Sequence, residues 1–210
     1  MSSYSWHFFI GMVVSFLGSI PLGTVNLKVI QTTINENVKA GLYFALGATL
    51  VELVYSWIAL KFSGFLIENS HIDYWIQVGA IPAFLCLGIY NYQKEHKAIL
   101  EVEQQVQKGK SFLNGIFIGL INPLQIPFWI AYGTLLLSND WIINDDAYLN
   151  VFILGIVTGS YLLLAILAFT SQKISRRLKI NGSNLNRLIG IVFILLACYQ
   201  LGKVLFFTDN

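Results

Sequence analysis

The sequence contains few charged residues. Only 11% of its 210 residues are charged, whereas 56% are hydrophobic, and soluble proteins carry roughly 25% charged residues. The charges gather in short segments and leave apolar stretches of about 20 residues or more, the length that crosses roughly 30 Å of hydrocarbon. This shortage of charge excludes a water-soluble fold and predicts a helical integral membrane protein.

Other residues are also scarce. The two cysteines, Cys86 and Cys198, lie inside apolar stretches, so we expect core thiols and no secreted disulfide framework. The three histidines fall at the ends of apolar stretches or in loops, and no His-Glu-x-x-His pattern occurs. A hydrolase needs a base beside its nucleophile or a zinc site. We therefore expect no enzymatic activity, no catalytic residue, no cofactor and no resident metal.

The apolar stretches predict the fold class, an all-α integral membrane protein with six transmembrane helices. The longest polar stretch, residues 93–111, is too short to form a domain and is interpreted as a cytoplasmic connector. No basic side chain precedes the first apolar stretch, so a cleavable signal is not expected. The expected spans are Trp6–Leu27, Gly41–Phe65, Tyr74–Tyr92, Phe112–Leu137, Tyr148–Ser171 and Leu185–Phe206.

The basic residues are unevenly divided between the two sides of the membrane. All 13 except Lys61 and Lys203 lie in or beside the loops that follow the first, third and fifth stretches. The opposite side holds Asp140, Asp145 and Asp146. Because basic loops stay in the cytoplasm, we expect an inner-membrane protein with both termini on the periplasmic side.

The two halves of the chain resemble each other. Phe44-Ala-Leu-Gly47 in the second stretch matches Phe152-Ile-Leu-Gly155 in the fifth, and Pro21-Leu22 matches Pro123-Leu124. Three spans per half place the halves in opposite orientations, as in the inverted repeats of many secondary transporters. We predict two inverted three-helix repeats in a single transmembrane domain. The domain is 1–210, with the first repeat at 1–92, the connector at 93–111 and the second repeat at 112–210.

Prolines interrupt the first and fourth stretches. A proline inside a helix frees the carbonyl four residues earlier, here that of Leu17 or Gly119. In hydrocarbon a free carbonyl is tolerated only where protein or a wet cavity satisfies it. A plain kink would explain one isolated proline, but two matching breaks favour inward-facing segments that bind substrate. The candidate substrate-binding residues in these segments are Pro21, Gly23, Asn26, Asn122, Pro123 and Gln125.

Glu52 is the only acidic residue deep inside an expected span. Insertion of a charged residue there costs about 2.5–3.5 kcal/mol, so the carboxyl is expected to be neutral, paired or water-facing. We expect it to bind the coupling proton or the ammonium group of the substrate; the alternative is a structural carboxyl bonded to a neighbouring helix. Small residues at helical spacing are interpreted as packing positions: Gly11, Ser15, Ser19, Gly115, Gly119, Gly155 and Gly159.

Three motifs resemble the lysine exporter (LysE) translocator family over most of the chain: Ile20–Leu27, Ala40–Glu52, and Asn122-Pro123 with Phe128-Trp129. The resemblance implies a bacterial inner-membrane exporter of amino acids or related small metabolites. Thr24 and Leu124 depart from the family pattern, so architecture transfers better than substrate. The family's Pro-x-Gly-x-x-Asn element, acidic residue and Asn-Pro pair correspond to Pro21, Gly23, Asn26, Glu52, Asn122 and Pro123.

Two other functions stay open. A divalent metal-ion exporter would need several carboxylates, thiolates or imidazoles, and a transmembrane thiol-redox protein would need two reactive thiols, for which Cys86 and Cys198 are the candidates. Glu52 with amide oxygens suits an ammonium group better, so we expect a secondary transporter that exports amino compounds by alternating access. Its expected partners are the small-molecule substrate, the lipid bilayer, protons and a second copy of the chain, but no nucleic acid.

Overall fold

The structure is a computed structural model, and its regular elements are all helices among the residues it describes. These residues are 3–20, 23–68, 109–122 and 125–177, together with 78, 81, 82, 85, 86, 88, 89, 92, 93, 191, 194, 195, 197, 198, 201 and 202.

The chain forms two compact units. The first comprises Met1–Ile67 and Val106–Lys179, and the second comprises Glu68–Gln105 and Ile180–Asn210. In the second unit the described residues are helical, but most of the third and sixth expected spans, and most of the connector, lie outside the described residues. Both cysteines belong to this unit and are exposed and free, so their expected placement in the core was wrong.

The first expected span consists of two helices, α1 (Tyr4–Gly18) and α2 (Thr24–Asn35). The hydroxyl of Ser3 caps α1 by accepting a bond from Trp6 N at 3.3 Å, and α2 begins after an extended Gly23. The expected end at Leu27 was wrong, because the helical turns continue to Asn35. Lys28, expected in a loop, is therefore a helical residue and is only 4% exposed.

The long helix α3 (Val38–Glu68) follows after a two-residue turn. Its start is capped by Asn37, whose Oδ1 accepts a bond from Ala40 N at 2.9 Å. One face of α3 is buried and carries Ala45, Ala48, Thr49, Glu52 and Ser56, whereas large apolar side chains cover the exposed face. Glu52 therefore lies on the face of α3 that turns toward the bundle.

The second half of the first unit contains α6 (Ser111–Leu120), α7 (Gln125–Ser138) and α8 (Asp146–Arg177). The helices α6 and α7 are bent by 65° at their break. By length and composition α3 and α8 can each cross a membrane, and the α6–α7 pair can form a third crossing. The expected count of six spans is therefore tested only in part by the described residues.

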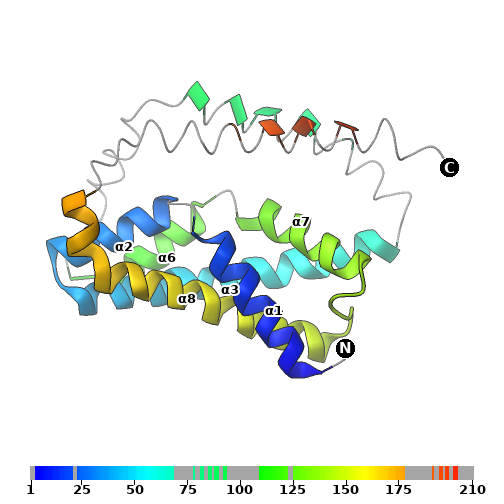
Figure 1. The fold of residues 1–210 in the computed structure, drawn as a ribbon, viewed down its shortest axis with the longest axis horizontal. Coiled ribbons are helices and arrows are strands. Elements are labelled where there is room, and N and C mark those ends of the chain that lie inside the picture. Colours follow the sequence, from blue (N-terminus) through cyan, green and yellow to red (C-terminus); the bar gives the residue numbers. More distant parts are fainter. Residues whose placement is uncertain are drawn as a thin grey trace. The chain divides into compact units, whose positions relative to one another are not determined.

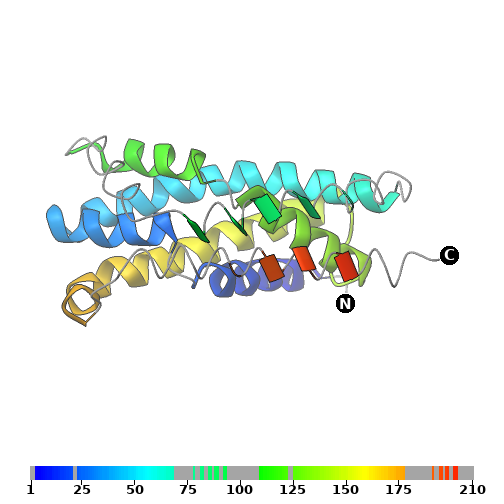
Figure 2. The same cartoon turned by 90° about the horizontal axis from the view of Figure 1, so that it is seen from above.

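The helices of this unit run in two directions (Figure 1). The chain passes along α1, α2 and α8 toward one end of the bundle, and along α3, α6 and α7 toward the other. Viewed from above, α2 and α6 again lie near one end, and α1 and α7 near the other (Figure 2). The core packs apolar side chains of α1, α3, α7, α8 and the α7–α8 loop around Trp129 and Phe152.

Glycines allow two helix pairs to touch at backbone distance. On α1 and α8, a Cβ at Gly11 would clash with the carbonyl oxygen of Phe152, and one at Gly155 would clash with that of Phe8. The helices α3 and α6 make the corresponding contact. A Cβ at Gly47 would clash with the carbonyl oxygen of Phe112, and a Cβ at Gly115 would clash with that of Phe44. The expected packing role of Gly11, Gly115 and Gly155 is confirmed, and Gly47, which was not predicted, has the same role.

Candidate functional site

The break between α1 and α2 is held by Asn26. Its side-chain nitrogen donates to the carbonyl oxygen of Ser19 at 2.7 Å, and the residue is buried. We expected the carbonyl of Leu17 to be the freed group, but that oxygen accepts from Ile20 N at 3.2 Å in the last turn. The carbonyl that needs a side-chain donor is therefore that of Ser19, just after the end of α1. Asn26 has the expected inward position.

The break between α6 and α7 is held from α3. The hydroxyl of Tyr55 donates to the carbonyl oxygen of Leu120 at 2.9 Å, whereas the oxygen of Gly119, expected to be free, accepts from Asn122 N at 3.1 Å. Beyond the break, Ser63 Oγ donates to the carbonyl oxygen of Ile130 at 3.1 Å. Side chains of α3 thus bond to both helices of the broken pair.

Glu52 lies at the middle of α3 and is only 5% exposed. Trp129 Nε1 on α7 donates to its Oε1 at 3.3 Å, and the hydroxyl of Ser160 on α8 faces the carboxyl. The hydroxyl of Ser15 on α1 faces the same group, but the two do not meet at hydrogen-bond geometry and Ser15 Oγ has no partner. Four helices therefore converge on one carboxyl.

Trp129 is held rigidly against this carboxyl. Its ring packs edge-on against Phe128 at 5.0 Å and against Phe152 at 6.3 Å between ring centroids, and it is 1% exposed. Such perpendicular aromatic pairs are favourable, and they leave the indole few alternative orientations. The N–H donor is thereby fixed in place for Glu52.

The polar groups that surround Glu52 are electrically neutral. The ion pair in the described part of the chain joins Lys61 and Asp146, and no described basic side chain makes a salt bridge with Glu52. An ionised carboxylate buried without a counter-charge is costly. The arrangement therefore suits a group that takes up a cation, which can be a proton, a metal ion or an ammonium group.

The expected site residues are only partly brought together. Gly23 precedes α2, Asn26 lies within it, Asn122 lies in the second break and Gln125 begins α7, with a buried Oε1 that has no partner. Glu52 instead lies beside Trp129, Ser160 and Ser15. The two breaks approach each other, because a Cβ at Gly18 would clash with the ring of Phe128. The prolines 21 and 123 lie outside the described residues.

Sequence reasoning missed Ser15 and Ser160 as neighbours of the carboxyl. Ser15 had been interpreted as a packing position, and Ser160 carries no local signal that separates it from any other helical serine. One signal was available: Ser160 stands at the same offset from Gly155 as Glu52 does from Gly47. If the halves repeat, these two residues are equivalents, and equivalents meet only near the axis that relates the halves.

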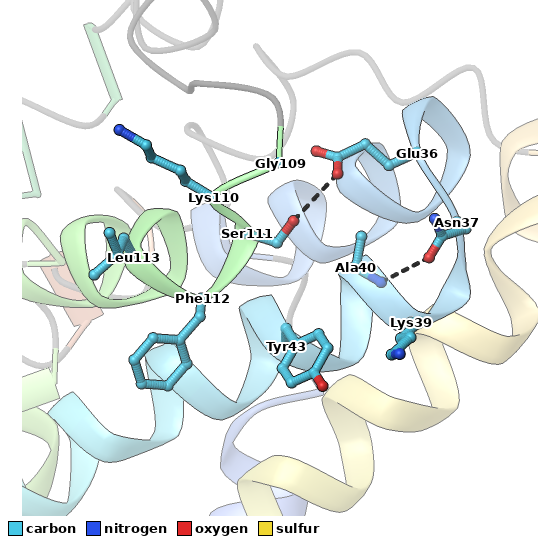
Figure 3. A pocket seen from close by; sticks show the side chains of 10 residues that line it. All are labelled: Glu36, Asn37, Lys39, Ala40, Tyr43, Gly109, Lys110, Ser111, Phe112 and Leu113. Atoms are coloured by element: carbon cyan, nitrogen blue, oxygen red, sulfur yellow. Dashed lines mark hydrogen bonds between the residues drawn. The ribbon is translucent and has the colours of Figure 1, made fainter.

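Grooves open at both ends of the first unit. One of about 430 Å³ lies where the α2–α3 turn meets the start of α6 (Figure 3), and there Ser111 Oγ donates to Glu36 Oε2 at 3.4 Å. Lys39 and Lys110 line its rim. Another of about 270 Å³ lies at the opposite end, beside the α7–α8 loop. Glu52 lines neither groove.

These features define a helical membrane protein whose helices are broken inside an apolar bundle, a construction common among transporters. The sequence model of the LysE type translocator family matches residues 16–203, so the chain belongs to that family. It is therefore a membrane translocator. Among curated proteins and among solved structures, no match to the chain was found.

Proposed function

We propose that the protein is a secondary transporter that exports amino acids or related small amino compounds across a bacterial inner membrane by alternating access. The observation that carries this proposal is the buried Glu52 carboxyl, which has only neutral partners. An ammonium group or a coupling cation supplies the missing positive charge. Asn26, Asn122 and Gln125 at the two breaks complete the proposed substrate site, with Pro21, Gly23 and Pro123 shaping its backbone.

Alternating access is supported by paired contacts within the first unit. Gly11 meets Phe152 as Gly115 meets Phe44, and each of these two contacts joins the first helix of one half to the second span of the other. The corresponding helices run in opposite directions (Figure 1). Both observations favour six spans arranged as two inverted three-helix repeats, in which the halves exchange conformations around a central site.

The proposed topology places both termini in the periplasm. The groove in Figure 3 is lined by Lys39 and Lys110, at the end of the first unit where α8 finishes with Arg176 and Arg177. This end is proposed to face the cytoplasm. The opposite end carries Lys61, whose charge is offset by its ion pair with Asp146. Each groove then marks the start of an access route toward Glu52 from one side.

Divalent metal export gains no support from the site. Among the described residues, no group of three or more histidine, cysteine, aspartate or glutamate side chains could hold a metal ion. Divalent ions favour several charged ligands, whereas one carboxyl with hydroxyl, amide and indole groups suits a singly charged species.

The first prediction concerns Glu52→Gln. Glutamine keeps the volume of the side chain and most of its hydrogen bonds but cannot carry a charge. We expect an inserted, folded protein that no longer concentrates substrate against a gradient, because each elementary charge moved across 100 mV exchanges about 2.3 kcal/mol with the membrane potential.

Purified protein in liposomes, with substrates taken from a metabolite-export screen, provides the measurement. Imposed proton and sodium gradients are compared for wild type and Glu52→Gln, with Glu36→Gln at the rim groove as the matched control. Gradient-driven transport by Glu52→Gln at the wild-type rate would show that the carboxyl is structural. Absence of any amino-compound export by wild type would refute the proposed substrate class.

A further inference from the structure

The three oxygen-bearing side chains at the centre come from three different helices. Ser15 is on α1, Glu52 is on α3 and Ser160 is on α8, and all three are at least nine-tenths buried. The Ser160 and Ser15 hydroxyls both face the carboxyl. A convergence of side-chain oxygens from separate helices is the kind of arrangement that coordinates a hard cation.

Ser15 Oγ is the unusual member of this group. Buried hydroxyls such as those of Thr49 and Thr33 donate to the backbone of their own helix, to the carbonyl oxygens of Ala45 at 3.0 Å and Val29 at 2.9 Å. Thr134 Oγ1 and Ser171 Oγ are buried without a partner, as Ser15 Oγ is, but of these three only Ser15 faces Glu52. Ser15 Oγ is fully buried and has no partner. A buried polar group without a partner is costly, so its lone pairs are available for a ligand that lies between it and Glu52.

The charge of the centre selects the ligand. One carboxylate is balanced by one positive charge, whereas a divalent ion would leave a buried surplus. Trp129 Nε1 occupies Glu52 Oε1, which leaves the second carboxylate oxygen to the ligand. A proton on that oxygen would neutralise the carboxylate and could be donated to only one of the two hydroxyl oxygens. A monovalent metal ion can be coordinated by the carboxylate and by both hydroxyl oxygens at once.

We propose that a sodium ion binds at this centre, coordinated by the Glu52 carboxylate and the Ser15 and Ser160 hydroxyl oxygens. The inference rests on the proposed transport function, for which sodium would be the coupling ion. Ser160 and Glu52 stand at equivalent positions after Gly155 and Gly47, so the ion would link the two halves of the chain. Its binding and release would then bias their relative movement.

Equilibrium binding of radioactive sodium to the purified full-length protein tests the proposal without any transport step. We expect saturable binding that unlabelled sodium displaces and that choline at the same ionic strength does not. Ser15→Ala removes one ligand and should weaken binding about tenfold, equivalent to about 1.4 kcal/mol. Glu52→Gln should abolish saturable binding. Ser160→Ala provides a second ligand variant should Ser15→Ala fail to fold.

Ser56→Ala is the matched control, because Ser56 is a buried serine on α3 whose hydroxyl donates to the carbonyl oxygen of Leu53 at 3.1 Å. It should bind sodium as wild type does. Folded wild type without saturable sodium binding, or ligand variants that bind like Ser56→Ala, would overturn the proposal. If sodium binding fails but the protein still exports amino compounds whether or not sodium is present, only the proposed ion is wrong. If the protein binds sodium but exports no amino compound, only the proposed function is refuted.

Discussion

At the scale of single residues, Trp129 is the most constrained neighbour of the buried carboxyl. Its N–H group donates to Glu52, and its ring is enclosed by Phe128 and Phe152. A hydrogen bond to a charged group contributes about 1.5–3 kcal/mol. The indole therefore has two separable roles, one in packing and one in stabilising the carboxylate.

Trp129→Phe separates these roles, because phenylalanine keeps an aromatic ring and loses the N–H group. We expect cation-driven transport to fall about tenfold or more, in line with the loss of one charge-assisted bond. Trp57→Phe is the matched control, since Trp57 is 46% exposed on the outer face of α3. Equal transport rates for the two variants in the same liposomes would argue that the bond to Glu52 has no part in transport.

His7 shows how a polar residue can be buried at a helix end. Its Nδ1 lies 3.0 Å from the carbonyl oxygen of Ser3, and its Nε2 accepts from Ile143 N at 3.0 Å. The ring also lies against Tyr148, with ring centroids 4.7 Å apart. Both ring nitrogens are satisfied in the neutral form, with the proton on Nδ1. His7 thereby ties α1 to the α7–α8 loop as a structural link.

At the scale of helices, the two glycine contacts set how closely α1 approaches α8 and α6 approaches α3. The atoms that oppose Gly11 and Gly115 are backbone atoms of the partner helices, which cannot rotate away as a side chain can. An added methyl group must therefore push the helices apart. Overpacking of this kind typically costs about 1–3 kcal/mol.

We expect Gly11→Ala and Gly115→Ala each to destabilise the protein by about 1–3 kcal/mol, and by similar amounts, because their contacts match. Ala131→Val serves as the control, since it adds bulk at an exposed position of α7. Thermal unfolding in detergent gives the comparison. A melting temperature unchanged by either glycine substitution would mean that the backbones are not in contact at that position.

The two broken helices differ in how they are held. Asn26 closes the first break from within α2, whereas Tyr55 closes the second from α3. The first break can therefore move with its own helix, while the second is attached to the helix that carries Glu52. A cation bound at Glu52 would thus act directly on the α6–α7 pair.

At the scale of the whole molecule, orientation in the membrane follows from charge. The positive charge of Lys61 is offset by its ion pair with Asp146. This increases the difference in positive charge between the two ends and strengthens the expectation that the basic loops face the cytoplasm.

Single cysteines at Asn139 and Gln104, in a Cys86→Ser, Cys198→Ser background, test this orientation. We expect a membrane-impermeant thiol reagent added to intact spheroplasts to label the cysteine at Asn139 and to reach the one at Gln104 only after lysis. Wild-type export by the cysteine-free background is the control for correct insertion. Labelling of both positions from the periplasm would contradict the proposed topology.

Composition and pattern alone determined that the chain is a helical membrane protein, that its first and fourth apolar stretches are interrupted and that Glu52 lies deep inside an expected span. These features depend on local rules: the length of apolar stretches, the missing N–H of proline and the spacing of small residues. The family resemblance seen in the motifs is confirmed by the match over residues 16–203.

Only the tertiary structure decided which groups meet the carboxyl and which carbonyls need side-chain partners. Ser15, Trp129 and Ser160 are far apart in the chain and lie beside Glu52 because α1, α3, α7 and α8 pack around one core. Likewise, the last turns of α1 and α6 tighten, so the carbonyl oxygens of Leu17 and Gly119 accept backbone bonds. The carbonyl oxygens that need side-chain donors are those of Ser19 and Leu120. Such partners depend on helix packing, which no local pattern in a single sequence encodes.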